Sequence, residues 1–389
     1  MSRKKITVNG SFRDMINTVK FLTERKKFID NSPAVLPTRT DDFGVNKVAK
    51  SLHPKMQRLI ISRIEEHKNI AKSYYFKSAE TPLAYFKAGQ YLTFRLEIGS
   101  SVVTRSYSIA SSPKSALEGE YQITVKRIAD GFVSDYILDN WKEGDEVIAY
   151  APEGNMTYCS LRDAKSIVAV AGGSGITPFL SLARAIAEGD ESCSLTLLYG
   201  CRASEEILFR EELDRLSENE KIKVVYVLSH SDEEGYEKGF VGADIIKKYA
   251  PEEEYSIFVC GPGGLYKFLE AELPKLGKER KYIRFEVFSS GKKSDEEPEE
   301  YSIRVINKGT ESEIKANSNE TVLCALERAG IEVPARCHTG ECGFCRSKLV
   351  EGKVYIPEGE DRRRIADIQF NFIHPCCCYP ESDLVIRIN

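Results

Sequence analysis

The sequence lacks any apolar run that approaches the roughly eighteen residues a membrane-spanning helix needs. The basic start Met1–Lys5 is not followed by the apolar segment of about seven or more residues that a secretory signal requires, so we expect none. No nucleic-acid-binding motif and no basic stripe with interleaved aromatic residues is present. The five histidines are scattered, and no pair has the spacing of metal ligands. These absences argue against a membrane-spanning, secreted or nucleic-acid-binding protein and against a histidine metal site.

The composition is that of a soluble protein with two or three domains. The chain has 389 residues, of which 42% are hydrophobic and 29% charged. Its net charge of −4 is unevenly spread, because residues 1–58 contain thirteen Lys and Arg against five Asp and Glu, a local +8 that leaves −12 for the remainder. A basic segment of this kind suits an acidic partner.

Six of the eleven cysteines lie in the last fifty-three residues and form a ligand pattern. Cys337, Cys342 and Cys345 give C-x₄-C-x₂-C, and Cys376 follows after thirty further residues. This spacing is typical of the thiolate cage of a plant-type [2Fe–2S] cluster, and the interleaved glycines let the loop bend around the cluster. A structural zinc site is the alternative, although zinc sites usually show C-x₂-C pairs or histidines. Because Cys376, Cys377 and Cys378 are consecutive, the fourth ligand is Cys376 or Cys377. Thiolates and free thiols suit a reducing compartment, so we expect a cytoplasmic protein.

Residues 1–52 are predicted to form an extension with one amphipathic basic helix. Ser11 and Asp14 have the spacing of a capping box. Apolar residues then recur at helical spacing, at Phe12, Met15, Ile16, Val19 and Leu22. The helix either packs this stripe on the body of the protein or forms a docking surface for a partner.

The remaining chain divides into three predicted domains and a linker. Residues 53–157 show short strands broken by turns, which predicts a small antiparallel β-barrel. Residues 158–289 alternate strands with helices near 177–188, 204–216, 242–249 and 264–273, which predicts a parallel doubly wound α/β sheet. Residues 290–300 are polar and charged and form the clearest linker. Residues 301–389 form a compact last module around the cysteine loop.

Two motifs in the barrel region have the chemistry of a flavin site. Arg105-Ser106-Tyr107-Ser108 ends a predicted strand, where a guanidinium suits a pyrophosphate, an aromatic ring can lie on a flavin and a hydroxyl can bond a ring nitrogen. Gly131, Phe132, Val133 and Ser134 open a helical stretch, whose backbone N–H groups suit a phosphate.

Two further motifs follow predicted strands of the α/β region. Gly172-Gly173-Ser174-Gly175-Ile176-Thr177-Pro178 forms a glycine-rich turn between a strand and a helix, but it matches neither the common dinucleotide fingerprint nor a P-loop. Cys260-Gly261-Pro262 ends another strand and places a thiol at its carboxyl end, where open α/β sheets bind ligands. In isolation, Cys260 would be an ordinary buried residue.

Together, these motifs resemble the ferredoxin–NADP reductase superfamily in its fused form with a C-terminal plant-type ferredoxin domain, as in reductase components of oxygenases. The resemblance covers about residues 53–389 and implies an FAD-binding barrel, an NAD(P)-binding domain and an α+β ferredoxin-like β-grasp domain. It implies that Arg105 holds the FAD pyrophosphate, Tyr107 stacks on the flavin ring and Ser108 approaches N5. It also favours Cys376 as the fourth cluster ligand, through Cys-x-x-Tyr-Pro. Independently of the resemblance, we expect His338 of the loop to face solvent.

The resemblance also assigns roles around the nicotinamide. Gly172 to Pro178 is similar to the family's nucleotide turn, and Cys260 to the thiol near nicotinamide C4. Glu286-Val287-Phe288 is similar to the terminal Glu-x-aromatic, in which Glu286 is catalytic and Phe288 shields the flavin. Ser108, Cys260 and Glu286 are therefore the expected catalytic residues. Here the chain continues beyond Phe288, which leaves its shielding role open.

The resemblance implies an enzyme in which NAD(P)H gives a hydride to FAD and single electrons pass through the [2Fe–2S] cluster to a separate acceptor protein. Arg202 and Ser204 could hold a 2′-phosphate, whereas Glu205 or Glu206 would repel it, so we expect a preference for NADH. The acceptor is a Rieske or di-iron oxygenase, or an oxygen-independent partner such as a hybrid-cluster protein. From another class, a non-enzymatic iron–sulfur electron carrier or redox sensor is the remaining alternative.

Overall fold

The computed structural model describes residues 10–31, 43–52, 54–80, 82–128, 132–286, 298–357 and 361–388. The described residues form two compact units, which divide between Lys50 and Ser51. The first unit contains α1 (Phe12–Asp30) and most of α2 (Gly44–Leu52). The predicted capping box is confirmed, because Ser11 N–H donates to Asp14 Oδ2 at 2.8 Å and Asp14 N–H donates to Ser11 Oγ at 3.2 Å. The role of this extension stays a prediction.

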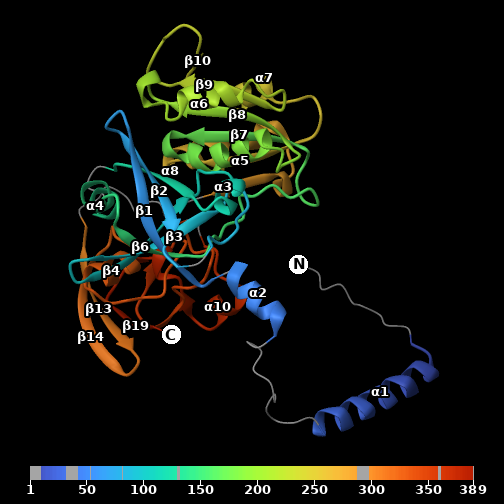
Figure 1. Cartoon of the computed structure of the whole chain (residues 1–389). Helices are drawn as coiled ribbons and strands as arrows, with labels where there is room; N and C mark the ends of the chain where they lie inside the picture. The colour runs from blue at the N-terminus through green and yellow to red at the C-terminus, as the bar shows by residue number, and fades with distance from the viewer. Residues whose placement is uncertain are drawn as a thin grey trace. The chain divides into compact units, whose positions relative to one another are not determined.

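The second unit begins with an antiparallel sheet of six strands (Figure 1). Its strand order is β4-β3-β6-β1-β2-β5, and every neighbouring pair is antiparallel. A bridge between Ile109, just after β4, and Ile123 of β5 brings the two edge strands together, so the sheet curls into a barrel. The elements are β1 (Met56–His67), β2 (Ala71–Ser78), β3 (Tyr91–Ile98), β4 (Ser101–Ser108), α3 (Pro113–Leu117), β5 (Tyr121–Lys126), α4 (Phe132–Asn140) and β6 (Glu146–Tyr150).

A parallel sheet with the order β10-β9-β8-β7-β11-β12 follows. The strand order reverses between β7 and β11, which makes this the topological switch point where open α/β sheets bind ligands. Its strands are β7 (Ser166–Gly172), β8 (Ser194–Cys201), β9 (Ile222–Leu228), β10 (Glu237–Lys238), β11 (Tyr255–Cys260) and β12 (Ile283–Glu286). Its helices are α5 (Thr177–Ala187), α6 (Arg210–Leu216), α7 (Ala243–Tyr249) and α8 (Gly263–Glu272).

One predicted helix of this region is shorter than expected. The stretch 204–216 begins with a single 3₁₀ turn, η3 (Ser204–Glu206), and α6 starts only at Arg210. Phe209 between them has a φ of +59°, which regular helix geometry does not allow. The apolar spacing predicted one helix because it carries no signal for this left-handed residue.

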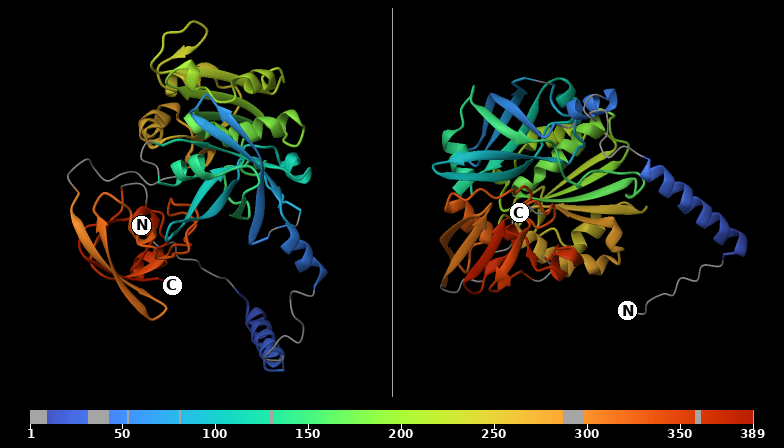
Figure 2. Two further views of the ribbon diagram at one scale, coloured as in Figure 1. Left: turned by 60° about the vertical axis from the view of Figure 1, so that its left-hand side comes forward. Right: turned by 90° about the horizontal axis from the view of Figure 1, so that it is seen from below.

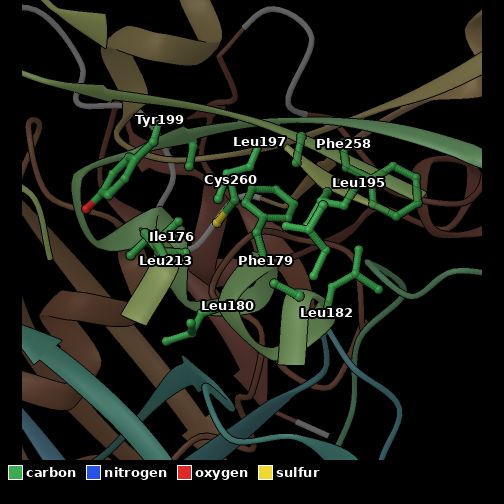
Figure 3. Close-up of a cluster of buried hydrophobic side chains, with 14 of the residues drawn as sticks. Ile176, Phe179, Leu180, Leu182, Leu195, Leu197, Tyr199, Leu213, Phe258 and Cys260 are labelled. Atoms are coloured by element: carbon green, nitrogen blue, oxygen red, sulfur yellow. The ribbon is translucent and has the colours of Figure 1, made fainter. Parts of the chain in front are cut away.

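The core between α5 and the parallel sheet is a cluster of buried side chains (Figure 3). Phe179 of α5 points toward residues of β8 and β11, among them Leu197 and Phe258, and Leu180 and Leu182 belong to the same buried cluster. Pro178 sits in the first turn of α5, where its missing N–H costs nothing. This packing fixes the position of α5 and of the glycine turn that precedes it.

The last sheet has five strands in the order β14-β13-β19-β15-β17, orange to red in Figure 2. The pair β13–β19 is parallel and the other pairs are antiparallel. Its strands are β13 (Glu300–Asn307), β14 (Thr310–Asn317), β15 (Ser347–Glu351), β17 (Phe372–Ile373) and β19 (Leu384–Ile388), with a small pair of β16 (Val354–Tyr355) and β18 (Tyr379–Pro380). Its helices are α9 (Val322–Arg328) and α10 (Ile365–Gln369), and η6 (Pro375–Cys377) is a 3₁₀ turn. The cysteine loop lies between α9 and β15.

The three predicted fold classes are confirmed: a barrel-like antiparallel sheet, a doubly wound parallel sheet and a mixed ferredoxin-like sheet. The predicted boundaries at 52, 157, 289 and 300 stay predictions, and much of the predicted linker lies outside the described residues. Within the described part of the chain, no helix is both long and apolar enough to cross a membrane.

Candidate functional site

Four cysteine sulfurs of the predicted cage come together at the cysteine loop. Cys345 Sγ lies 3.4 Å from Cys376 Sγ. Hydrogen bonds with the thiols of Cys342 and Cys376 lower the pKa of the Cys337 thiol, which places these two thiols beside it. Residues that are far apart in the sequence thus supply one sulfur-lined site.

Backbone N–H groups point at these sulfurs. The N–H groups of Thr339 and Cys342 each donate to Cys337 Sγ at 3.4 Å, and the Gly340 N–H donates to Cys376 Sγ at 3.2 Å. Gly340 has a φ of +77°, and a Cβ added there would lie 2.7 Å from Cys377 Sγ. Donors aimed at sulfur stabilise thiolate charge, so this loop fits an iron–sulfur cluster.

The arrangement is not that of a single-ion site. In the residues that the structure describes, no group of three or more His, Cys, Asp or Glu side chains has the geometry to hold one metal ion. A two-iron cluster places its four thiolates on two irons, so its ligands need not converge on one point.

The three consecutive cysteines have different surroundings. Cys376 Sγ meets Cys345 Sγ and the Gly340 N–H, whereas the Cys377 thiol donates to the His374 carbonyl at 3.5 Å. Cys378 is fully buried in the core of the last sheet. The geometry favours Cys376 as the fourth ligand, while Cys377 Sγ lies beside Gly340 of the cysteine loop and bonds the His374 carbonyl.

The start of the cysteine loop is docked on β4 of the barrel. The Thr104 hydroxyl donates to the Ala335 carbonyl at 2.9 Å and accepts from His338 Nε2 at 3.0 Å. The Ser106 hydroxyl donates to the Arg336 carbonyl at 2.9 Å. The predicted cluster loop therefore touches the strand that carries the predicted flavin motif.

Two of these contacts differ from the sequence expectations. His338 was expected to face solvent, but it is half-buried against Thr104, and burial lowers its pKa to about 3. Ser106, expected at the flavin, bonds the cysteine loop and lies 2.8 Å from Thr93 Oγ1. The local motif gave no sign of either contact because both partners lie far away in the sequence.

Ion pairs strengthen the same contact. Arg105 Nη1 lies 3.1 Å from Glu327 Oε2 of α9, and Arg336 pairs with Glu153 beyond β6. Glu327 is buried, which raises the pKa of its carboxyl, while Arg105 opposes this rise. Because Arg105 is partly exposed while Glu327 is buried, the pair is worth more than an exposed ion pair but less than a fully buried one. Arg105 thus already holds one anionic partner besides the pyrophosphate expected there.

A cavity of about 420 Å³ lies where the three sheets meet. It is lined by the barrel end at Tyr91 and Gly154, by β12 with Glu286, and by Cys337 and Cys342 of the loop. Tyr91 is the register partner of Ser108 across β3 and β4. Residues from the strand paired with the flavin motif, from the nucleotide domain and from the cluster cage therefore surround one space.

Ser108 and Glu286 have buried polar atoms that await a partner beside this cavity. Neither Ser108 Oγ nor Glu286 Oε2 makes a hydrogen bond of ordinary geometry within the described residues. The pKa of Glu286 is raised to about 8, mainly by burial and also by the charge of Glu341, while the nearby Ser108 hydroxyl opposes the rise. Orphaned polar atoms at a cavity fit the binding of a polar ring such as a flavin.

Other predicted flavin residues are less fully described. Val133 and Ser134 are buried on α4, and Phe132 at its start is exposed. Tyr107 packs against the barrel core near Phe94. Gly131 and Phe288 lie outside the described residues, so their predicted roles stay predictions.

The predicted nucleotide turn and the Cys-Gly-Pro segment are packed together at the switch point. A Cβ on Gly175 would lie 2.2 Å from the Cys260 carbonyl oxygen, and one on Gly172 would lie 2.9 Å from Pro262 Cδ. Gly261 also lies against Gly172, because a Cβ added to Gly261 would be 3.2 Å from the Gly172 Cα. Glycines are required here because the backbones of two neighbouring strand ends touch.

The remaining turn residues are held by local bonds. Gly173 has a φ of +54°, and its carbonyl accepts from the Tyr199 hydroxyl at 2.9 Å. The Thr177 hydroxyl donates to the Ser174 carbonyl at 3.0 Å. These contacts present the turn at the amino end of α5, as phosphate binding requires.

The Cys260 thiol is buried among the hydrophobic side chains between α5 and the parallel sheet, and burial raises its pKa well above the usual value (Figure 3). It is not among the residues that line the cavity, so its expected place beside the nicotinamide stays a prediction. Tyr266 organises the neighbouring backbone, because its hydroxyl accepts from the Gly261 N–H at 2.9 Å and donates to the Glu286 carbonyl.

Arg202, just beyond β8, is bound to carboxylates of its own chain. Its Nε lies 2.9 Å from Glu206 Oε1, while Lys126 Nζ lies 3.4 Å from Glu206 Oε2. Ser204 Oγ donates to Glu233 Oε1 at 3.0 Å. Both groups expected to hold a 2′-phosphate are thus paired with carboxylates.

Comparison with known proteins gives three matching family models. They are an oxidoreductase FAD-binding domain over residues 59–158, an oxidoreductase NAD-binding domain over 169–271 and a 2Fe–2S iron–sulfur cluster binding domain over 305–381. The glycine betaine monooxygenase reductase subunit of Chromohalobacter salexigens is 27% identical over 81% of this chain and 91% of its own length. The ferredoxin reductase component of Rhodococcus rhodochrous 3-ketosteroid-9-alpha-monooxygenase is 31% identical over 77% of this chain and 86% of its own.

The chain belongs to the fused flavin and iron–sulfur reductase family. The solved structure of phthalate dioxygenase reductase matches 86% of this reductase and 98% of its own chain, at 28% identity and a TM-score of 0.64. The reductase is an oxidoreductase with FAD-binding, NAD-binding and [2Fe–2S] domains in one chain, and it transfers electrons. The 2Fe–2S match over 305–381 also decides against zinc.

Sequence reasoning missed several residues of this reductase that shape the site. Tyr266, Tyr91 and Glu327 act through contacts with distant segments, and no local motif marks them. Lys126 is similar: it lies beside the nucleotide turn, where a Cβ on Gly173 would be 3.8 Å from its Nζ. The sequence signal available for Lys126 was its place at the end of the strand 121–126.

Replacing Gly175 with Ala is expected to impair nicotinamide binding. The new Cβ would overlap the Cys260 carbonyl, so the turn or the strand end must move, at a cost of about 1–3 kcal/mol. We expect KM for NADH to rise about tenfold or more while flavin content is kept. Steady-state kinetics with ferricyanide measure this. Gly264→Ala is the matched control, since nothing lies within 4 Å of a Cβ there, and equal effects of both changes would contradict the close approach.

Glu286→Gln is expected to change how stability depends on pH. The carboxyl has a pKa of about 8 in the folded protein against 4.5 as the ordinary value, so the folded protein binds the proton more tightly. Its burial therefore costs stability progressively as pH rises from about 5 to 8. Relative to wild type, the variant should gain up to a few kcal/mol (about 1.4 per pKa unit) above pH 8 and nothing at pH 5. Thermal unfolding across this range measures the difference, and a pH-independent difference would contradict it.

Proposed function

We propose that this reductase carries electrons from NADH to a separate oxygenase component. The observation that carries the proposal is the likeness over most of the chain to proteins named as reductase components of monooxygenases and of phthalate dioxygenase. The docking of the cysteine loop on β4 supports it, because it brings the cluster cage beside the flavin motif. The alternative of a carrier without enzymatic activity has no support of this kind.

The chain's residues bind and orient the cofactors in this proposal. Arg105 and the amino end of α4 hold the FAD pyrophosphate, and Tyr107 and Ser108 face the flavin ring. The turn from Gly172 to Thr177 holds the nicotinamide nucleotide, while Cys337, Cys342, Cys345 and Cys376 hold the cluster. When bound, FAD accepts a hydride from NADH and the cluster carries the electrons onward singly.

Ser108 and Glu286 control protons at the site. With a pKa of about 8, the Glu286 carboxyl keeps its proton at neutral pH and can donate it, and the Ser108 hydroxyl lies close enough to influence that pKa.

The preference for NADH follows from the charges beyond β8. A 2′-phosphate would have to displace Glu206 from Arg202 and Lys126, and Glu206 would repel it. The ribose hydroxyls of NADH carry no charge and can bond these same carboxylates. As part of this proposal we place the protein in the cytoplasm, because none of the eleven cysteines forms a disulfide, which suits a reducing compartment.

Glu206→Gln is expected to weaken the preference for NADH. The change removes the repelling charge and releases both cations, so the ratio of kcat/KM for NADPH to that for NADH should rise about three- to tenfold. Glu205→Gln is the matched control, since Arg202 and Lys126 pair with Glu206 and not with Glu205. A ratio unchanged by Glu206→Gln, or changed equally by both variants, would contradict this assignment.

The proposed function is tested with the tagged full-length holoprotein and the protein that co-purifies with it from its own cells. We expect that partner to contain iron and the mixture to consume oxygen with NADH, while either protein alone does not. NADH oxidation with ferricyanide should need the reductase only. A partner that is reduced without oxygen uptake would replace the oxygenase with an oxygen-independent acceptor, and absence of NADH-dependent ferricyanide reduction would reject the enzyme altogether.

A further inference from the structure

His374 is a buried histidine without a role in the site described above. It precedes η6, two residues before Cys376, and only 2% of its surface is exposed. Its Nδ1 lies 2.8 Å from the Gly340 carbonyl oxygen. Since a carbonyl can only accept, Nδ1 carries the proton and donates to Gly340.

Both backbone polar groups of Gly340 therefore bond the short segment from His374 to Cys376. Its carbonyl accepts from His374, and its N–H donates to Cys376 Sγ at 3.2 Å. Gly340 stands in the left-handed region, and the closeness of Cys377 Sγ leaves no room for a side chain. Its own backbone preference is weak, because glycine is the most flexible residue. The direction of its N–H depends on what holds its carbonyl.

The other side of the imidazole packs against α10. Its Nε2 faces the buried Asp367 Oδ2 at 3.8 Å, beyond hydrogen-bond distance, and makes no hydrogen bond within the described residues, so Nδ1 makes the ring's hydrogen bond. Arg346 bonds Asp367 Oδ1, while the Arg364 N–H donates to Asp367 Oδ2 at 3.3 Å. Asp367 is thus held in place by other residues, and the buried ring is packed between α10 and the cysteine loop, with Gly340 as its hydrogen-bond partner.

We propose that His374 is a positioning residue that holds the Gly340 N–H on the sulfur of Cys376 and thereby raises the reduction potential of the cluster. A hydrogen bond to a ligand sulfur stabilises the additional negative charge of the reduced cluster, so it favours reduction. Loss of the His374 donor frees Gly340 to rotate and lengthens this bond. The consequence is a cluster that is harder to reduce, with no change in its four ligands.

Two substitutions separate hydrogen bonding from packing. In His374→Asn the amide Nδ2 stands where the imidazole Nδ1 was and can donate to the same carbonyl. In His374→Leu a side chain of similar reach has no donor. Both variants lose the imidazole ring, but only His374→Leu also loses the hydrogen bond to Gly340.

The potential of the cluster is measured in the purified holoprotein by redox titration, followed by electron paramagnetic resonance of the reduced cluster. We expect His374→Leu to shift the reduction equilibrium about tenfold toward the oxidised form, which is about 59 mV for a one-electron couple. His374→Asn should stay within about twofold of wild type. No acceptor protein takes part, so the result is independent of the proposed function.

The other outcomes overturn the proposal. Equal shifts in both variants would show that packing of the ring matters and the hydrogen bond does not. No shift in either would show that the Gly340 N–H needs no support. His374→Met serves as a second variant without a donor. If both His374→Leu and His374→Met fail to hold a cluster that His374→Asn retains, the contact is needed for assembly and the proposed tuning is rejected.

Discussion

The contact between Thr104 of β4 and the start of the cysteine loop holds the predicted cluster cage on the strand that carries the predicted flavin motif. One hydroxyl bonds both the Ala335 carbonyl and the His338 ring, on either side of the first cluster ligand, Cys337. Transfer of an electron by tunnelling weakens exponentially with distance, so a reductase must fix the separation of its two redox centres. Here β4, which ends at Ser108, also contains Thr104, the residue that bonds the cysteine loop. The separation is thus built into one strand of the barrel.

The predicted nicotinamide-nucleotide site depends on a different constraint, which is the close approach of the backbone at the end of β7 to that at the end of β11. Gly172, Gly175 and Gly261 bring the ends of β7 and β11 into contact at the switch point of the sheet. Tyr266 then joins the Gly261 N–H to the carbonyl of Glu286 at the end of β12. Three neighbouring strand ends are held together in this way. As a result, the carboxyl of Glu286 reaches the cavity beside Ser108.

The sequence allowed a site to be predicted where its residues lie close together in the chain. The C-x₄-C-x₂-C loop and the turn from Gly172 to Pro178 were recognisable because their spacing alone reports the backbone geometry they need. Prediction failed where a side chain acts on a distant segment: Ser106 bonds the cysteine loop, and His338 is not solvent-facing. Tyr266 and His374 have no local signal either, since a tyrosine or a histidine is marked as functional only by what it meets in space.

The central claim is that electrons pass from the flavin site to the cluster within one chain, through the contact at Thr104. The most direct measurement mixes the holoprotein rapidly with NADH and follows the rate of cluster reduction over a wide range of protein concentrations. The structure predicts one rate at every concentration, and a slower rate at every concentration for Thr104→Val. A rate that rises in proportion to protein concentration would show transfer between molecules and would contradict the claim.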